Sequence, residues 1–346
     1  MRPSVRGSVW QDGLMLAVLI VHFGEASVTA EAISSVLPQL PDDARLLLLD
    51  NASGTWTPPL ADSRVELVAS ARNLGFAGGM NRLIDHALQD PAVDTVLLLN
   101  NDVRAGPGLV DALLALRTTR ADADMVATRM LRADRPTQID SLGITLYRSG
   151  LASNRKHPEE RLLGPTGGCM LLSRRLLEDL DAQQGYWFDE RFFCYAEDTD
   201  LVMRARWLGY GCAFAEDVYA LHHGSLSSGG PDNEFVLYHG IRNSIWALVR
   251  NAPAVWLVVF SPWLLVAHAG IWARNLRKGR AGTLWRLYRD ALRGLPAMWR
   301  DRRIIRRSRR IRARAWWSWV EPRLYERDFL RRAWQELWRR GRRSGP

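Results

Sequence analysis

The residues with the clearest chemical potential lie in one stretch near the middle of the chain, residues 186–210. In this stretch an aromatic cluster is followed by three carboxylates, Glu197, Asp198 and Asp200, and then by a helical pattern. Asp198 and Thr199 are residue types that cap helix N-termini, so the sequence predicts these carboxylates at the positive end of a helix. A carboxyl group packed among aromatic rings has a raised pKa, which suits a general base. An ordinary acidic helix cap beside core aromatics fits the same stretch equally well.

Apolar segments typical of buried strands alternate with helical segments in the first half of the chain. We expect strands over residues 14–23, 45–50, 65–70, 95–100, 125–131 and 167–172. This alternation predicts an α/β fold with a mostly parallel sheet and right-handed crossovers. Ligands bind such sheets at the carboxyl ends of the strands, where Asp50, the glycine-rich turn 73–79 and Asp102 fall. Residues 132–164 are polar and irregular, which fits either a lid or acceptor loop or a plain surface connection.

The polar residues at this edge suit a nucleotide and a divalent cation. Asp50 could accept hydrogen bonds from a nucleobase or a ribose, although an Asp-Asn pair is more often a turn former. Asp102 offers a hard oxygen for Mg²⁺ or Mn²⁺, ions that bind through one or two protein groups plus substrate phosphates. His222 or His223 could supply an imidazole to Mn²⁺, although such a pair is more often structural. No GxGxxG or P-loop pattern is present, which argues against a Rossmann or kinase site.

The order of these features along the chain resembles that of the family 2 glycosyltransferases with the GT-A fold, in their bacterial rhamnosyltransferase-like branch. The matching segments are LLLLDNASG, NLGFAGGMN, LLLNNDV, TGGCMLLSRRLL, FDERFFCYAEDTDLVMRARWLGY and LHHGSLSSGG. They cover roughly residues 15–250. The resemblance implies a GT-A nucleotide-sugar-binding domain over residues 1–250. A helical, basic, membrane-associating region over residues 251–346 would follow it.

The resemblance also implies a role for each matching residue. Asp198, in the pair with Glu197, would be the catalytic base. Asp102 would hold the metal together with His222, although His223 could be the true match. The residues that would contact the nucleotide or the donor sugar are Asp50, Asn73, Gly75, Asn100, Asn101, Gly167 and Gly168. Asn100 stands where many relatives have the first Asp of the metal motif, which puts direct ribose binding there in doubt.

The implied reaction is an inverting sugar transfer that depends on Mg²⁺ or Mn²⁺. The donor would be a nucleotide sugar, dTDP-rhamnose in the first instance, and the acceptor a lipid-linked saccharide of cell-surface polysaccharide synthesis. A UDP-hexose or galactofuranose donor is the same-class alternative. A non-catalytic nucleotide-sugar-binding membrane protein is the alternative from another class.

The charge of the chain is unevenly distributed. Residues 274–346 hold 24 basic and 6 acidic residues, which gives this tail a net charge of +18. Since the whole chain has a net charge of +10, residues 1–273 carry −8. A basic tail on an acidic body predicts contact with an anionic surface, either lipid or nucleic acid. Because the sequence holds no RNA-reading module, we expect no specific nucleic acid partner, and an RNA-binding protein driven by the tail is the rival interpretation.

Residues 254–273 form an apolar run long enough to span a bilayer, interrupted by Pro262. A single span would place the Arg-rich tail across the membrane from the nucleotide-sugar site, against the positive-inside tendency. We therefore expect a re-entrant or interfacial pair of helices, with a buried core helix as the third possibility. Helical patterns over 284–295 and 324–338 combine Trp and Arg, which suits a headgroup surface or a charged helix packed on the body.

Cysteine usage bears on the compartment. The chain has three cysteines, Cys169, Cys194 and Cys212, with no CxxC pattern, and its first residues are too polar for a secretory signal. Both features fit a reducing cytosol. Together with the apolar run and the basic tail, they predict a peripheral or monotopic protein on the cytoplasmic face of a membrane, which the resemblance implies is the bacterial inner membrane.

Overall fold

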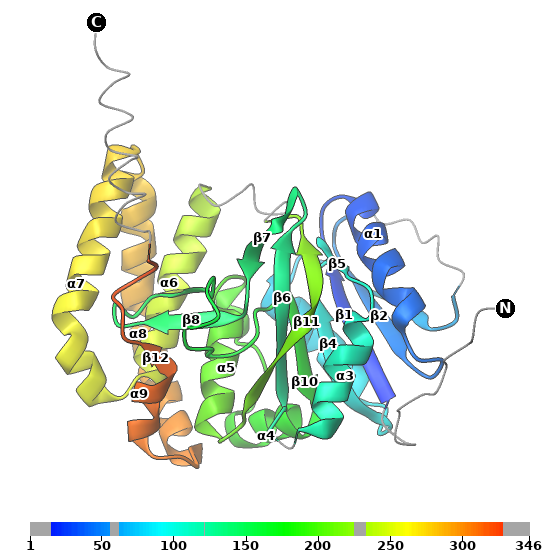
Figure 1. Cartoon of the computed structure of the whole chain (residues 1–346). Helices are drawn as coiled ribbons and strands as arrows, with labels where there is room; N and C mark the ends of the chain where they lie inside the picture. The colour runs from blue at the N-terminus through cyan, green and yellow to red at the C-terminus, as the bar shows by residue number, and fades with distance from the viewer. Residues whose placement is uncertain (1–14, 56–61, 121, 225–232, 328–346) are drawn as a thin grey trace, which may run out of the picture.

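A computed structural model describes residues 15–55, 62–120, 122–224 and 233–327 of the chain. Its centre is a mixed sheet with the order β3-β2-β1-β4-β10-β6-β11-β5, in which β7 pairs with β6 (Figure 1). The strands are β1 (Met15–His22), β2 (Arg45–Asn51), β3 (Val65–Ser70), β4 (Val93–Leu99), β5 (Val103–Ala105), β6 (Met125–Arg132), β7 (Arg135–Ser141), β10 (Cys169–Ser173) and β11 (Cys212–His222). Strands β3, β2, β1 and β4 run parallel, whereas β10 is antiparallel to both of its neighbours. The α/β fold and the six predicted strands are confirmed.

Helices cover both faces of the sheet, which explains why its central strands are apolar on both sides. Helices α1 (Ala26–Val36) and α3 (Leu109–Thr119) pack on one face with Val18 and Ile20 of β1. Helices α2 (Gly75–Leu88), α4 (Arg174–Gln184) and α5 (Glu197–Trp207) pack on the other face with Ala17 and Leu19. The alternation of β1 residues between two cores follows the period of two along a strand.

The segment 132–164 is more ordered than its polar composition suggests. It contains β7, β8 (Ile144–Tyr147) and β9 (Ala152–Asn154). Strand β8 is buried at all four positions, and it forms a small second sheet of order β12-β8-β9 with β12 (Val320–Glu321) from the far end of the chain. The prediction of an irregular segment is therefore wrong, because the four residues ITLY find a distant partner strand that local sequence does not reveal.

The C-terminal region packs onto the body of the protein. Helices α6 (Glu234–Asn251), α7 (Ala254–Arg277) and α8 (Ala281–Ser308) stand beside the sheet, with α7 outermost (Figure 1). Trp256, Ile305 and Trp316 belong to the same hydrophobic core as the α2 face of the sheet, and Trp316 opens the short helix α9 (Trp316–Trp319). The division of the chain at residue 250 remains a prediction.

Residues 254–273 lie within a single helix, so the predicted pair of helices is wrong. Pro262 lacks the N–H that would bond to the carbonyl of Val258, and the hydroxyl of Ser261 donates to that carbonyl instead at 2.8 Å. The helix is long and apolar enough to cross a membrane, and only 11% of its most apolar window is buried. That exposure also excludes the buried core helix.

The two helices predicted nearer the C-terminus have different outcomes. The first, over residues 284–295, is confirmed as part of α8. The second, over residues 324–338, is wrong at its start because residues 324–327 are not helical, and residues 328–338 lie outside the described part of the chain.

Candidate active site

A cleft of about 850 Å³ opens at the carboxyl ends of the central strands. Its lining includes the strand-end residues Asn51, Asn100, Asn101, Asp102 and His222 and the glycine pair Gly167 and Gly168. It also includes Glu197, Asp198 and Thr199 from residues 197–200, which we call the acidic turn. On the opposite side it is lined by residues of α6 and the residue before it, namely Asn233, Phe235, Gly240 and Ser244. The volume suits a drug-sized or nucleotide-sized ligand.

The acidic turn reaches this cleft from the first turn of α5. The helix begins at Glu197, and the residue at its N-cap is Ala196, with a left-handed φ of 64°. The prediction that Asp198 and Thr199 cap the helix is therefore wrong. The left-handed residue turns the chain before Glu197, so that all three carboxylates lie inside the first turn, where the helix dipole favours negative charge.

Asp198 and Glu197 form a buried acidic pair with different contacts. Asp198 Oδ2 accepts a hydrogen bond from the backbone N–H of Gly167 at 2.9 Å, and its Oδ1 accepts from the N–H of Thr199 at 2.6 Å. Glu197 is 7% exposed, and its Oε2 has no hydrogen-bond partner among the described residues. Burial raises the pKa of Asp198, and burial together with the nearby Asp198 raises the pKa of Glu197 well above its usual range. A carboxylate with a raised pKa at the wall of a cleft is equipped to accept a proton near neutral pH.

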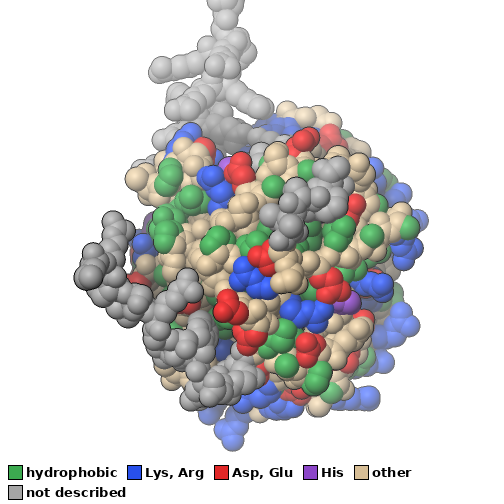
Figure 2. All heavy atoms as spheres, turned by 90° about the vertical axis from the view of Figure 1, so that its right-hand side faces the viewer, with side chains coloured by type: hydrophobic (Ala, Val, Ile, Leu, Met, Phe, Trp, Pro, Cys, Tyr) green, Lys and Arg blue, Asp and Glu red, His purple; other side chains and the backbone are tan. Residues whose placement is uncertain are grey.

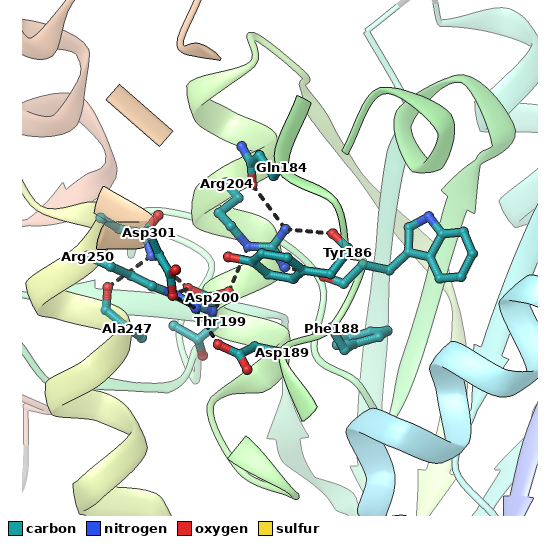
Figure 3. Close-up of polar contacts among 12 residues, drawn as sticks. Gln184, Tyr186, Phe188, Asp189, Thr199, Asp200, Arg204, Ala247, Arg250 and Asp301 are labelled. Atoms are coloured by element: carbon teal, nitrogen blue, oxygen red, sulfur yellow. Dashed lines mark hydrogen bonds and ion pairs between the residues drawn. The ribbon is translucent and has the colours of Figure 1, made fainter. Parts of the chain in front are cut away.

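Asp200 belongs to a different structure, a fully buried ion-pair network. Its carboxylate accepts from Arg204 Nε at 2.7 Å, from Asn251 Nδ2 at 2.8 Å and from Arg250 (Figure 3). Arg250 continues the network to Asp189 at 2.5 Å. The network ties α5 to α6 beneath the cleft, so Asp200 supports the site without lining it.

Of the residues predicted to contact the nucleotide, the structure places Asn73 and Gly75 at the cleft but not Asp50. Asn73 and Gly75 line the cleft, where Gly75 N–H donates to Asn73 Oδ1 at 2.8 Å. Asp50 does not line it, because its Oδ1 accepts from the N–H and the hydroxyl of Ser53 at 3.0 and 2.7 Å. Its neighbour Asn51, which sequence reasoning missed, lines the cleft and bonds to Leu74 N–H at 2.8 Å. The one-residue shift follows from the alternation of side chains along a strand.

The residues of the Asn100–Asp102 segment have different contacts: Asn101 stabilises the loop, whereas Asn100 and Asp102 offer oxygens at the cleft. Asn101 donates from Nδ2 to Phe23 O and to Thr29 Oγ1 at 3.2 and 3.1 Å, which fixes the loop. Asn100 Oδ1 is buried without a partner among the described residues, and Asp102 is 6% exposed at the cleft. An unpaired amide oxygen and a carboxylate are the hard donors that a divalent cation prefers.

His222, rather than His223, faces the cleft. Its Nδ1 lies 2.6 Å from Asp140 Oδ2, and its Nε2 lies 3.5 Å from Asp102 Oδ2. Burial opposes a charge on His222, but the hydrogen bonds with Asp102 and Asp140 outweigh it and raise the pKa to about 9. Within the described ranges, no group of three or more His, Cys, Asp or Glu could hold a metal alone. A cation here would therefore need oxygens from the substrate.

The glycine pair shapes the wall next to Asp198. A Cβ on Gly167 would lie 3.3 Å from the Phe76 ring and 3.5 Å from Asp198 Cβ, and a Cβ on Gly168 would lie 2.7 Å from Met130. Sequence reasoning placed this pair correctly at the entrance of a strand, β10. It missed Asp140 and the residues of α6, which lie outside the motifs and carry no local signal of their own.

Comparison with known proteins shows which family the chain resembles. Residues 17–181 match the model of glycosyl transferase family 2. The chain is 29% identical over 259 residues to the N-acetylglucosaminyl-diphospho-decaprenol L-rhamnosyltransferase of Mycobacterium tuberculosis, covering 65% of this chain and 81% of that protein. It is 22% identical over 242 residues to the low-salt glycan biosynthesis hexosyltransferase Agl10 of Haloferax volcanii, covering 67% of this chain and 75% of that protein.

Among solved structures, the chain is similar to the mannosyltransferase PcManGT of Pyrobaculum calidifontis, determined in complex with GDP-Man and Mn²⁺. The TM-score is 0.50 at 17% identity, with 85% of each chain covered. The chain therefore has a mixed α/β fold of the GT-A type. Residues 17–181 therefore match a glycosyltransferase family 2 domain, and the chain is similar to rhamnosyltransferase-like members of that family.

Proposed function

We propose that this enzyme is an inverting, metal-dependent glycosyltransferase that moves rhamnose from dTDP-rhamnose to a lipid-linked saccharide in cell-surface polysaccharide synthesis. The observation that carries the proposal is Asp198, a carboxylate of raised pKa at the cleft wall, held by Gly167 N–H. The choice of sugar and of lipid-linked acceptor follows the name of the mycobacterial relative.

Asp198 would act as general base. It takes the proton of the acceptor hydroxyl as that oxygen bonds to the anomeric carbon, while the bond from this carbon to the diphosphate breaks on the opposite side. One base is sufficient for this displacement, whereas a hydrolase needs two carboxyl groups. Backbone contacts with Gly167 and Thr199 orient the carboxylate without neutralising it.

The metal and donor would lie on the strand-end side of the cleft. Asn100 Oδ1 and Asp102 would hold Mg²⁺ or Mn²⁺ together with the donor phosphates, and the ion would offset the charge of the departing diphosphate. His222, whose Nε2 lies 3.5 Å from Asp102 Oδ2, would supply an imidazole on the same side of the cleft. Asn51, Asn73 and Gly75 would form the wall for the nucleoside.

A lipid-linked acceptor requires a membrane surface near the cleft. The exposed apolar side chains of α7 include Val255, Val258, Leu265 and Val266, which are 63–73% exposed. Trp285, Leu292 and Trp299 repeat every seven residues along the exposed side of α8, among arginines. Figure 2 shows the side of α1 instead, where acidic, basic and hydrophobic side chains are interspersed. Exposed apolar side chains flanked by arginines are typical of interfacial helices.

The fold favours docking on the cytoplasmic leaflet over crossing it. Only three residues separate α7 from α8, and α8 returns along the body, where its Arg302 donates to Val249 O at 2.6 Å. A spanning α7 would pull the Arg-rich start of α8 across the bilayer, at a cost of several kcal/mol for each arginine. A peripheral or monotopic attachment avoids this cost.

The test of the reaction is a donor panel measured by calorimetry with Mn²⁺: dTDP-rhamnose, UDP-glucose, UDP-galactose, UDP-galactofuranose and GDP-mannose. We expect metal-dependent binding of dTDP-rhamnose that Asp102→Ala weakens. Asp198→Asn should keep donor binding and lower turnover about 10²- to 10⁴-fold. Binding of a different donor would show that rhamnose is not the transferred sugar. An active Asp198→Asn variant would show that Asp198 is not the general base.

The test of the membrane surface is co-sedimentation with vesicles of phosphatidylglycerol. We expect Val258→Asp with Val266→Asp to abolish sedimentation, because both side chains lie on the exposed side of α7. Leu67→Asp, at a 45% exposed position on β3, is the matched control and should sediment as the wild type does. Unchanged sedimentation of the α7 variant would exclude this docking surface.

A further inference from the structure

The backbone just before the acidic turn is strained. Phe193, Tyr195 and Ala196 have left-handed φ angles of 66°, 68° and 64°, although none of them is glycine. Such conformations are unfavourable for residues other than glycine and persist only where the surrounding structure holds them. The segment 192–196 lines the cleft from residue 193 onward and leads directly into Glu197 and Asp198, so its shape decides where the base lies.

Two adjacent side chains of α6 hold this segment by its carbonyl groups. Asn243 Nδ2 lies 2.9 Å from Phe192 O, 2.8 Å from Cys194 O and 2.8 Å from Tyr195 O. Arg242 Nη2 lies 3.1 Å from Arg191 O and 3.2 Å from Phe192 O. Since an amide has two N–H groups, one of them is shared between two of its three carbonyl partners. Asn243 is 0% exposed, so these bonds are made away from water.

The two remaining carbonyls of the segment accept hydrogen bonds from backbone N–H groups of α2 and α5. Phe193 O accepts from the N–H of Ala77 in α2 at 3.1 Å, and Ala196 O accepts from Asp200 N–H at 3.0 Å. Gly75 permits the first contact, because a Cβ there would lie 2.4 Å from Phe193 O. Every carbonyl from residue 191 to residue 196 therefore has a donor. The carbonyl of Phe192 also accepts from Cys194 N–H at 2.8 Å, whereas Arg242 or Asn243 supplies the donors described for residues 191, 194 and 195.

The orientation of the two side chains is itself fixed. Asn243 Oδ1 accepts from Arg242 Nε at 2.9 Å, which turns the amide so that its N–H groups face the segment. The guanidinium of Arg242 lies over the rings of Trp246 and Tyr238, at 4.4 and 4.9 Å from their centres. Arg242 thus fixes Asn243, and Asn243 fixes the strained segment.

We propose that Asn243, supported by Arg242, is a positioning residue: its contacts with three carbonyls hold the strained segment 192–196 in the conformation that presents Asp198 to the cleft. Neither side chain lines the cleft. The pair acts through Asp198, so the catalytic part of this inference rests on the proposed function. The part that concerns the strained segment does not.

The test replaces only the N–H donors. Asn243→Asp keeps the size of the side chain and the oxygen that faces Arg242, but removes the donors to the three carbonyls. Asn275→Asp is the matched control, since Asn275 is 7% exposed, donates to Ile271 O at 2.9 Å within its own helix, and does not line the cleft. Arg242→Lys is a second variant that loses the fork geometry but keeps the charge.

Hydrogen–deuterium exchange gives a readout that needs no substrate. We expect the amides of residues 192–200 to exchange at least about tenfold faster in Asn243→Asp, because the strained conformation opens more often. Arg242→Lys should give a smaller increase in the same peptide, and Asn275→Asp should give none there. Unchanged exchange of this peptide in folded Asn243→Asp would overturn the proposal.

Kinetics separates positioning from general damage. With the donor that the wild type turns over, Asn243→Asp should lower kcat about 10²-fold while the donor dissociation constant changes less than about threefold. A parallel loss of donor binding, or full retention of kcat, would contradict a positioning role. A wild type that turns over no donor would overturn the proposed function instead, and the exchange result would still decide the role of Asn243.

Discussion

Asp198 and Asp200 lie two residues apart in the same helical turn, yet the pKa of Asp198 is raised and that of Asp200 is lowered. Burial opposes the ionisation of Asp200, but Arg250 and Arg204 outweigh it and hold the pKa of this carboxyl below its usual range. Burial also dominates at Asp198, where backbone hydrogen bonds from Gly167 and Thr199 offset only part of it, so the pKa is raised. The difference lies in which groups the rest of the fold places opposite each carboxylate.

The contrast separates the two tasks of the acidic turn. Asp200, together with Arg250 and Asp189, fastens α5 to α6 (Figure 3). Glu197 and Asp198 face the cleft, where the described contacts supply no arginine, and they retain the unfavourable environment that gives a base its proton affinity. Stability is concentrated on one side of the turn and reactivity on the other.

The largest effect is expected from Arg250→Met. This change leaves Asp200 and Asp189 in the interior with one arginine partner fewer each, and breaking a buried ion pair costs about 3–5 kcal/mol. Arg289→Met is the control, because Arg289 is 41% exposed in its pair with Asp290 and should lose less than about 1 kcal/mol. Urea unfolding measures both. Equal losses in the two variants would remove the distinction between the interior network and a surface pair.

The pH dependence of stability should have opposite signs at the two ends of the turn. A raised folded-state pKa at Glu197 gives stability that is present below the unfolded pKa and is lost as pH rises through the folded value. A lowered pKa at Asp200 gives stability that is present above the unfolded pKa and is lost as pH falls through the folded value. Glu197→Gln should therefore become more stable than the wild type as pH rises, whereas Asp200→Asn should be less stable at neutral pH.

Unfolding free energies measured from pH 3 to pH 9 check both expectations. The deficit of Asp200→Asn should shrink toward acid pH, because protonation of the carboxyl group in the unfolded wild type removes the stability that its lowered folded-state pKa supplies. The advantage of Glu197→Gln should vanish at the acid end for the corresponding reason. Parallel curves for the two variants would show that the arginines do not decide the behaviour of this turn.

The sequence predicts the strands and the motif positions because these are local patterns. The runs RLLLLD and TVLLLN are buried on both faces and end at the cleft, as parallel strands require. Gly75, Gly167 and Gly168 lie where the motifs predict, because close approach of Phe193, Phe76 and Met130 leaves little room for a side chain.

Tertiary contacts decide what the sequence could not. The resemblance assigns the nucleotide to Asp50, which remains a prediction. In the structure its Oδ1 accepts from Ser53, and the neighbouring Asn51 lines the cleft. Asp140 meets His222 through a strand that is recognisable only once β7 pairs with β6. Two arginines distinguish Asp200 from Asp198. Arg204 lies four residues after Asp200 in the same stretch, whereas Arg250 lies 50 residues further along the chain and no pattern within residues 186–210 reveals it.

The smallest change in stability is expected at Gly240 of α6, a helix that also has a buried side and a side that lines the cleft. This helix presents Asn243 and Arg250 to the interior, while Gly240 and Ser244 line the cleft. A Cβ on Gly240 would meet nothing within 4 Å, so packing does not require glycine there. Glycine in a helix interior costs about 1 kcal/mol relative to alanine, and Gly240→Ala should therefore stabilise the protein by about 0.5–1 kcal/mol. Gly270→Ala in α7 also has open space around its Cβ, lies outside the cleft, and should give the same gain in thermal unfolding.

The two glycine positions should differ only when the side chain becomes large. If the α6 side of the cleft receives the acceptor, Gly240→Leu should raise the KM for the lipid-linked saccharide about tenfold or more and leave donor affinity unchanged. Gly270→Leu should change neither constant for a soluble acceptor analogue. An unaffected acceptor KM in Gly240→Leu would show that the acceptor enters elsewhere, and α6 would then serve the reaction only through its buried side.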